Sequence, residues 1–373
     1  WQISDEQGGP GAESIAVSFA KRSLAAMLQP AGRIAVACND PGVFPATPLN
    51  LRHQSLRGHA LGTDSSCELV VAFGSGEQPD SGQQRAKRVE GQLVDREGVL
   101  ALGRAEVAAI PHAVFVLDAY ATRDDRDLAM AAWLEGHIPG AFYADLNQDL
   151  SSPPRPDTGR HPLPDPEQLR TLLGGFGIGK ATRVVAYDEG GGGLAARLWW
   201  LLRWMGHGPV VLLDGGFSAW QTAGLPVDRD VPALRTRRFE GQPGQMPVRD
   251  ASQVAAGLAG DSIRLLDMRA EERFLGRVEP IDPIAGHVPG AVNAPFGGSL
   301  TADNRFQPAE VLASRYAALA HGRAPGEIVC MCGSGVTACH GIFALELAGM
   351  PGAALYPGSW SEWIRSPDRP VAT

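Results

Sequence analysis

From about residue 98 onward, short apolar runs alternate with segments whose apolar residues recur at helical spacing. The runs 114–118 and 263–267 are typical of buried strands, and residues 195–205 are typical of a helix covering them. Alternation of this kind is the pattern of a mainly parallel sheet with helices on its faces. The sequence therefore predicts an α/β fold.

This pattern occurs twice. The strand-like runs 114–118 and 263–267 both end in aspartate, and the motif Gly-His-Ile-Pro-Gly-Ala at 136–141 returns as Gly-His-Val-Pro-Gly-Ala at 286–291. Both pairs are separated by about 150 residues, which indicates two copies of one domain. We expect the first copy at 98–228 and the second at 248–373.

The remaining segments have a different composition. Residues 229–247 contain several prolines and a basic run, which is typical of a linker with a solvated face. Residues 1–97 show weak periodicity and scattered glycine and proline, so we leave their role unassigned, with a small appended domain and a poorly ordered extension as the alternatives.

The sequence around Cys332 predicts a strand, a tight turn and a helix. An apolar run ends just before it, and apolar residues at helical spacing begin near His340. The glycines flanking Ser334 allow a turn in which the backbone N–H groups of Gly333, Ser334, Gly335, Val336 and Thr337 converge on the sulfur at the positive end of the helix. A thiol held there should ionise more readily than a free cysteine, which makes Cys332 a candidate nucleophile.

Other residues of this region have plainer interpretations. Ser334 is equally well a turn residue or a group that donates to the cysteine or moves a proton, and Thr337 is expected to cap the helix. Cys330 and Cys339 are expected to pack in the core. The cysteine spacing lacks the pairing of a zinc site, so we expect no metal. The first copy has Asp188 in place of Cys332, so we expect it to be non-catalytic.

The composition excludes several classes of binding partner. A net charge of −8 and a pI near 5.6 give no electrostatic basis for binding nucleic acid or an anionic membrane surface. No apolar run reaches the roughly 18 residues of a membrane span. The 5 cysteines in 373 residues do not form a disulfide framework. A nucleophilic thiol needs a reducing compartment, and we expect the cytoplasm.

The six residues from Cys332 to Thr337 resemble the active loop of the 3-mercaptopyruvate sulfurtransferases, in the two-domain rhodanese family. The resemblance covers roughly residues 98–373. Related thiosulfate sulfurtransferases carry basic residues where this chain has Gly333 and Ser334. Phosphatases of similar architecture need an arginine at the position of Ala338, so phosphatase chemistry is disfavoured.

The resemblance implies two tandem rhodanese-like domains and transfer of a sulfane sulfur. The donor would be 3-mercaptopyruvate, Cys332 would carry the sulfur as a persulfide, and the acceptor would be cyanide or a thiol, with thioredoxin as a candidate. No cofactor is implied. The alternatives are thiosulfate as donor, or a non-enzymatic rhodanese-like binding module, whose usual mark is a missing active cysteine.

The resemblance also implies residues for binding the donor. Its carboxylate calls for a cation, and Arg273 matches the position of a substrate arginine in the family. A second family arginine falls at Ile281, for which Arg277 is the nearest substitute. His137 matches a histidine that the family places near the cleft between the domains. The alternative for the arginines is a surface salt bridge, and for His137 a structural role.

Overall fold

The computed structural model describes residues 130–233 and 236–373, together with strands β1 to β7. The chain divides into two compact units, one of residues 1–85 and 230–233 and the other of residues 86–229 and 234–373. In the first unit, β1 (Gln2–Ile3) pairs antiparallel with β2 (Ile15–Ala16), and β3 (Ile34–Ala35) with β4 (Ala72–Phe73). Apart from these strands and β5, residues 1–97 lie outside the described residues, so the alternatives for this segment are not addressed.

The second unit contains two sheets. The strands of the first are β5 (Gly91–Asp95), β6 (Gly98–Leu102), β7 (Ala113–Leu117), β8 (Phe142–Asp145), β9 (Val184–Tyr187) and β10 (Val210–Leu213). They lie in the order β6-β5-β10-β9-β7-β8, with β7 to β10 parallel and β5 antiparallel to both of its neighbours. The sheet therefore includes a strand, β5, from before residue 98.

The second sheet repeats the parallel part of the first. Its strands are β11 (Arg264–Asp267), β12 (Val292–Asn293), β13 (Ile328–Met331) and β14 (Ala354–Leu355). Their order, β12-β11-β13-β14, matches β8-β7-β9-β10, and all are parallel. The predicted α/β fold with two repeats is confirmed.

Helices follow the strands in the same order in each repeat. In the first they are α3 (Pro166–Gly175), α4 (Ala195–Trp204) and α5 (Gly216–Thr222). In the second they are α6 (Ala251–Ala259), α7 (Glu271–Phe274), α8 (Ala309–Ala320), α9 (Thr337–Leu347) and α10 (Ser359–Trp363), with short 3-10 turns at Phe296–Ser299 and Pro325–Glu327. Asp165 and Asp250 begin α3 and α6 by accepting backbone N–H bonds, which is the usual role of an N-cap. No helix among the described residues is long and apolar enough to cross a membrane.

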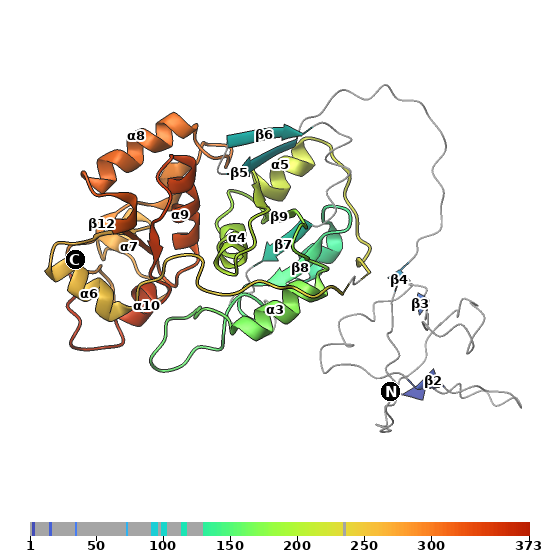
Figure 1. Ribbon diagram of the computed structural model, residues 1–373, viewed down its shortest axis with the longest axis horizontal. Coiled ribbons are helices and arrows are strands. Elements are labelled where there is room, and N and C mark those ends of the chain that lie inside the picture. Colours follow the sequence, from blue (N-terminus) through green and yellow to red (C-terminus); the bar gives the residue numbers. More distant parts are fainter. Residues whose placement is uncertain are drawn as a thin grey trace, which may run out of the picture. The chain divides into compact units, whose positions relative to one another are not determined.

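The two repeats pack through α4 and α9, which lie side by side between the sheets (Figure 1). Trp199 of α4 meets Phe343 of α9 edge to face, with ring centroids 4.9 Å apart. Helix α9 is buried almost around its whole circumference, as expected for a helix with apolar residues on every face. Buried residues of both repeats consequently form one continuous apolar cluster.

A buried arginine reinforces this interface. Arg197 of α4 is 0% exposed, and its Nη1 donates to the carbonyl oxygen of Gly335 in the second repeat at 3.2 Å. Its Nη2 lies within hydrogen-bonding distance of three carbonyl oxygens in the first repeat, those of Leu150, His161 and Pro162. One guanidinium group therefore joins the two repeats at the turn that follows Cys332.

We expect Arg197→Met to destabilise the protein. Methionine fills similar space but leaves the buried carbonyl oxygens without a donor, which should lower the free energy of unfolding by roughly 2–4 kcal/mol. Chemical denaturation measures the change. The matched control is Arg203→Met, the same substitution at a half-buried position of the same helix, which should cost less than about 0.5 kcal/mol. Equal losses in the two variants would contradict this role for Arg197.

Candidate active site

Cys332 directly follows β13, at the carboxyl ends of the parallel strands, where α/β folds usually bind ligands. Its side chain is 2% exposed, and its Sγ accepts the backbone N–H of Gly335 at 3.1 Å. Gly335 has φ +81°, and a Cβ there would lie 2.4 Å from the carbonyl oxygen of Pro357. Only glycine fits this position, so the predicted tight turn depends on it.

The start of α10 holds the loop from the other side. The hydroxyl of Ser359 accepts the N–H of Cys332 at 3.1 Å, and the N–H groups of Trp360 and Ser361 donate to the carbonyl oxygens of Cys332 and Gly333. Ser359 itself is fully buried at φ 54°, a left-handed conformation that is uncommon outside glycine. Such local strain is found where surrounding contacts determine the backbone.

Two expectations about the loop need correction. The N-cap of α9 is Val336, whose backbone is already helical, and no side chain caps the helix. Thr337 is the first helical residue, so its predicted capping role is wrong. Within the described part of the chain, the N–H found bonded to the sulfur is that of Gly335, whereas we expected several of the residues from Gly333 to Thr337 to contribute.

Ser334 belongs to a hydrogen-bonded chain that crosses between the repeats. Its Oγ lies 2.7 Å from Nδ1 of His161, and Nε2 of His161 lies 2.8 Å from Oδ1 of Asn147. Because a carbonyl oxygen can only accept, the ring proton is assigned to Nε2, and Nδ1 then accepts the hydroxyl proton of Ser334. Burial, together with the charges of Arg197 and Arg160, lowers the pKa of His161 to about 3, so the ring is neutral near pH 7.

Arg273 lies beside the loop, and its role in binding the donor stays a prediction. Both of its terminal nitrogens are 3.6 Å from the position that a Cβ on Gly333 would occupy. Its guanidinium pairs with Glu279 at 2.7 Å and with Asp282 at 3.2 Å. Asp267, the last residue of β11, pairs with Arg269 at 2.6 Å.

Arg277 and His137 are not brought to this group. The Arg277 side chain is 61% exposed and pairs with Glu272, as in the surface salt-bridge alternative. His137 is 0% exposed, stacks on Trp133 and bonds through Nδ1 to the carbonyl oxygen of Trp133. These are contacts of a structural residue, and His287 of the second repeat makes the same kind of contacts with Phe274.

The equivalent loop of the first repeat holds a carboxylate where the second holds a thiol. Asp188 accepts four backbone N–H groups, from Gly190, Gly192, Leu194 and Ala195. Its side chain is buried. A side chain of the chain itself therefore occupies this loop, and the non-catalytic role of the first repeat stays a prediction.

The other cysteines described by the structure are core residues. Cys330 and Cys339 are free and 0% exposed. Burial raises the pKa of Cys339 to about 12 and also raises that of Cys330, so both are protonated thiols near neutral pH. The described residues include no group of His, Cys, Asp or Glu side chains suited to holding a metal ion.

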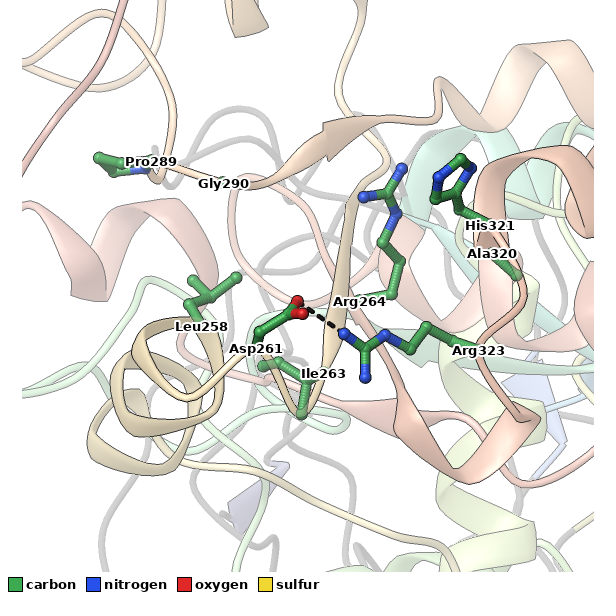
Figure 2. A pocket seen from close by; sticks show the side chains of 9 residues that line it. All are labelled: Leu258, Asp261, Ile263, Arg264, Pro289, Gly290, Ala320, His321 and Arg323. Carbon is green, nitrogen blue, oxygen red and sulfur yellow. Dashed lines mark ion pairs between the residues drawn. The ribbon is translucent and has the colours of Figure 1, made fainter.

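A pocket of about 280 Å³ lies away from this loop. Figure 2 shows Arg264, His321 and Arg323 on its wall, with Arg323 paired to Asp261 at 2.6 Å. Arg264 is the first residue of β11, so the pocket lies at the amino end of the sheet. Cys332 follows the carboxyl end, and the pocket is therefore not part of the candidate site.

Several site residues were missed from the sequence, and most come from the first repeat. They are Asn147, Arg160, His161 and Arg197 from the first repeat, and Asp282 and Ser359 from the second. The adjacent pair Arg160-His161 in a proline-rich loop was the available signal. It could not be interpreted without knowing that this loop lies against Cys332.

The fold and this loop define a class: a tandem α/β protein with a cysteine at a strand–turn–helix junction. The model of the rhodanese-like domain matches residues 106–223 and 250–366. A probable 3-mercaptopyruvate sulfurtransferase of Pseudomonas aeruginosa is 51% identical over 262 residues, covering 70% of this chain and 92% of that protein. A putative thiosulfate sulfurtransferase of Mycobacterium tuberculosis is 37% identical over 287 residues, covering 74% and 97%.

A solved structure agrees with these matches. The 3-mercaptopyruvate sulfurtransferase from Leishmania major superposes with a TM-score of 0.60 at 26% identity, covering 70% of this chain and 73% of that one. The chain belongs to the two-domain rhodanese family and is a sulfurtransferase.

We expect the buried neutral His161 to make stability sensitive to acid. The unfolded chain takes up a proton at this ring below about pH 6.5, but the folded chain does so only near pH 3, so stability falls as the pH drops between these values. His161→Gln removes this proton uptake. Its loss of unfolding free energy between pH 7 and pH 4.5 should be smaller than that of the parent chain by roughly 2–3 kcal/mol, as measured by urea denaturation.

The control for this experiment is Ser334→Ala. It removes the hydrogen-bond partner of His161 but keeps the titrating ring, so it should lose as much stability on acidification as the parent chain. An unchanged acid sensitivity in His161→Gln would mean that the ring is not held neutral.

Proposed function

We propose that this sulfurtransferase moves a sulfane sulfur from 3-mercaptopyruvate to a thiol or cyanide by way of a persulfide on Cys332. The observation that carries the proposal is that the Cys332 sulfur accepts the backbone N–H of Gly335, while the guanidinium group of Arg273 lies beside the neighbouring Gly333. The N–H group stabilises a thiolate at this position, and the guanidinium group offers charged donors to the carboxylate of the sulfur donor.

In the first half-reaction, the Cys332 thiolate attacks the sulfur of the donor. The new S–S bond forms as the C–S bond breaks, and the electron pair of that bond leaves with the three-carbon fragment as the enolate of pyruvate. Protonation of the enolate carbon completes pyruvate. The N–H of Gly335, which bonds to the resting sulfur, is placed to stabilise the negative charge of the persulfide.

The proton balance of this step involves Ser334 and His161. The donor arrives with a thiol proton and the enolate needs one. Ser334 can accept the thiol proton while passing its own to Nδ1 of His161, 2.7 Å away. The proton then returns from Nδ1 through Ser334 to the enolate carbon, which leaves the ring neutral again. The relay uses no outside acid.

In the second half-reaction, an acceptor attacks the outer sulfur of the persulfide. Cyanide leaves as thiocyanate and a thiolate leaves as a persulfide, and in both cases the Cys332 thiolate departs from the S–S bond and is regenerated. A dithiol protein such as thioredoxin would remove the sulfur in turn as sulfide, with formation of its own disulfide. We propose the cytoplasm as the location, because both the Cys332 thiol and such an acceptor must be kept reduced.

Thiosulfate is the second candidate donor, because the relative from Mycobacterium tuberculosis is named as a putative thiosulfate sulfurtransferase. The loop residues Gly333 and Ser334 supply no charge of their own for such a dianion. Comparing kcat/KM for the two donors with cyanide as acceptor decides between them. We expect 3-mercaptopyruvate to be preferred by at least about tenfold, the effect of one well-placed charged hydrogen bond.

Cys332→Ser should abolish turnover with either donor. Incubation of the parent chain with 3-mercaptopyruvate and no acceptor should release pyruvate once per chain and add the mass of one sulfur atom to the peptide containing Cys332. The control is Cys330→Ala, which removes a buried thiol of β13 and should keep both activities. Retained turnover in Cys332→Ser would contradict the persulfide mechanism.

Arg273→Ala should raise the KM for 3-mercaptopyruvate by roughly tenfold or more, because it removes a charge-assisted hydrogen bond to the donor carboxylate. The matched control is Arg277→Ala, which removes an exposed arginine from the segment just after α7. Steady-state kinetics measure both variants. An unchanged KM in Arg273→Ala would remove this residue from the donor site.

A further inference from the structure

Two guanidinium groups from different repeats converge on Gly333, the residue after Cys332. Arg273 belongs to α7 of the second repeat, and Arg160 to the segment between β8 and α3 of the first. A Cβ on Gly333 would lie 3.0 Å from Nη2 of Arg160 and 3.6 Å from Nη1 and Nη2 of Arg273. The two guanidinium groups therefore lie beside the backbone of the residue that follows Cys332.

The position of Arg160 is set by close contact between the repeats. Its backbone N–H donates to Oγ of Ser361 in α10 at 3.0 Å. At the preceding Gly159, a Cβ would lie 2.4 Å from the carbonyl oxygen of Gly358, so the backbones approach more closely than any side chain would allow. Arg160 is thus held by the same helix start that holds the Cys332 loop.

Asp282 orients both guanidinium groups. Its Oδ1 pairs with Nη1 of Arg160, and its Oδ2 accepts Nη2 of Arg273 at 3.2 Å. Its side chain is 3% exposed, compared with 29% for Arg160 and 18% for Arg273. The carboxylate of Glu279 accepts hydrogen bonds from both Nε and Nη2 of Arg273. Buried carboxylates that hold planar cations in this way fix the direction of the remaining N–H groups.

These ion pairs leave one terminal nitrogen on each arginine uncommitted. In the described ranges, no acceptor bonds to Nη2 of Arg160 or to Nη1 of Arg273. Both of these nitrogens lie beside Gly333. A pair of unused N–H donors on oriented guanidinium groups is suited to a carboxylate, whose two oxygens can each accept one.

The charges of the cluster favour one kind of anion. The two arginines are balanced by Glu279 and Asp282, so recognition depends on the direction of the donors more than on net positive charge. A planar carboxylate satisfies that geometry, whereas a dianion without it gains less.

We propose that Arg160 and Arg273 form a clamp for the carboxylate of the sulfur donor, with one arm from each repeat and Asp282 setting the distance between them. The assignment of the clamp to a sulfur donor rests on the function proposed above. The clamp also has a consequence that does not depend on the donor: Arg160 should guide any small carboxylate that reacts at Cys332.

Alkylation of Cys332 tests that claim without sulfur transfer. Iodoacetate carries a carboxylate and iodoacetamide is its uncharged counterpart, so the ratio of their alkylation rates reports the clamp. The ratio should fall about tenfold in Arg160→Met, the effect of losing one charged hydrogen bond. The rates are measured from the mass of the peptide that contains Cys332. Arg160→Lys, which keeps the charge but loses the planar fork, should give an intermediate ratio.

The control is Arg365→Met. Arg365 is exposed and lines the same cavity of about 430 Å³ as Arg160, so it tests for a general effect of charge. It should leave the ratio and the activity nearly unchanged. An unchanged ratio in Arg160→Met, or an equal fall in Arg365→Met, would overturn the clamp. If the substitution disturbed the fold, the rate of alkylation by iodoacetamide would change as well. An unchanged iodoacetamide rate therefore shows that the fold around Cys332 is intact.

Kinetics with 3-mercaptopyruvate then link the clamp to the reaction. The KM in Arg160→Met should rise about tenfold, with a smaller change in kcat. If the parent chain does not use 3-mercaptopyruvate, but Arg160→Met still lowers the alkylation ratio, then 3-mercaptopyruvate is not the donor. The carboxylate clamp would still be supported.

Discussion

The contact between α4 and α9 is the constraint on which the candidate site depends. These helices merge the cores of both repeats, and Arg197 of α4 donates to Gly335 in the turn that begins α9. Gly335 in turn donates its N–H to the Cys332 sulfur. A shift of one repeat against the other would therefore move the backbone group that contacts the nucleophile. The near-complete burial of Arg197 makes such a shift costly, because every carbonyl oxygen that it serves would lose its donor.

The residues of the candidate site are divided between the repeats. The second repeat carries the thiol and Arg273, while the first carries His161, Asn147 and Arg160. Neither repeat alone contains Cys332, His161 and both arginines. This division gives the first repeat a reason to persist without a cysteine of its own. It also means that the interface, more than either core, determines the distances between reacting groups.

The parts of the fold that were predictable from the sequence are those governed by local pattern. Buried strands, the duplicated motifs and the glycine turn after Cys332 each leave a signal within a few residues, and Arg273 lies near that turn by its place in a matched motif. Arg160 and His161 leave no such signal, because their role comes from contacts with Ser334 and Asp282, more than a hundred residues away in sequence. His137 shows the converse difficulty: it was selected from a repeated motif, and the structure shows it buried and stacked on Trp133, contacts that the motif alone does not reveal. The predicted capping by Thr337 failed because Val336 holds the N-cap position and Thr337 is already the first residue of the helix.

Asp188 gives the duplicated chain a further property. Its carboxylate is covalently attached to the cradle that it fills, so it competes with free anions at a very high effective concentration. A free anion such as phosphate or sulfate would have to compete with a group that cannot diffuse away from the loop. In the second loop, the corresponding position is held by the Cys332 sulfur, which accepts the N–H of Gly335. Duplication has thus produced one loop whose N–H groups are bonded to a carboxylate of the chain itself and one loop built around a thiol.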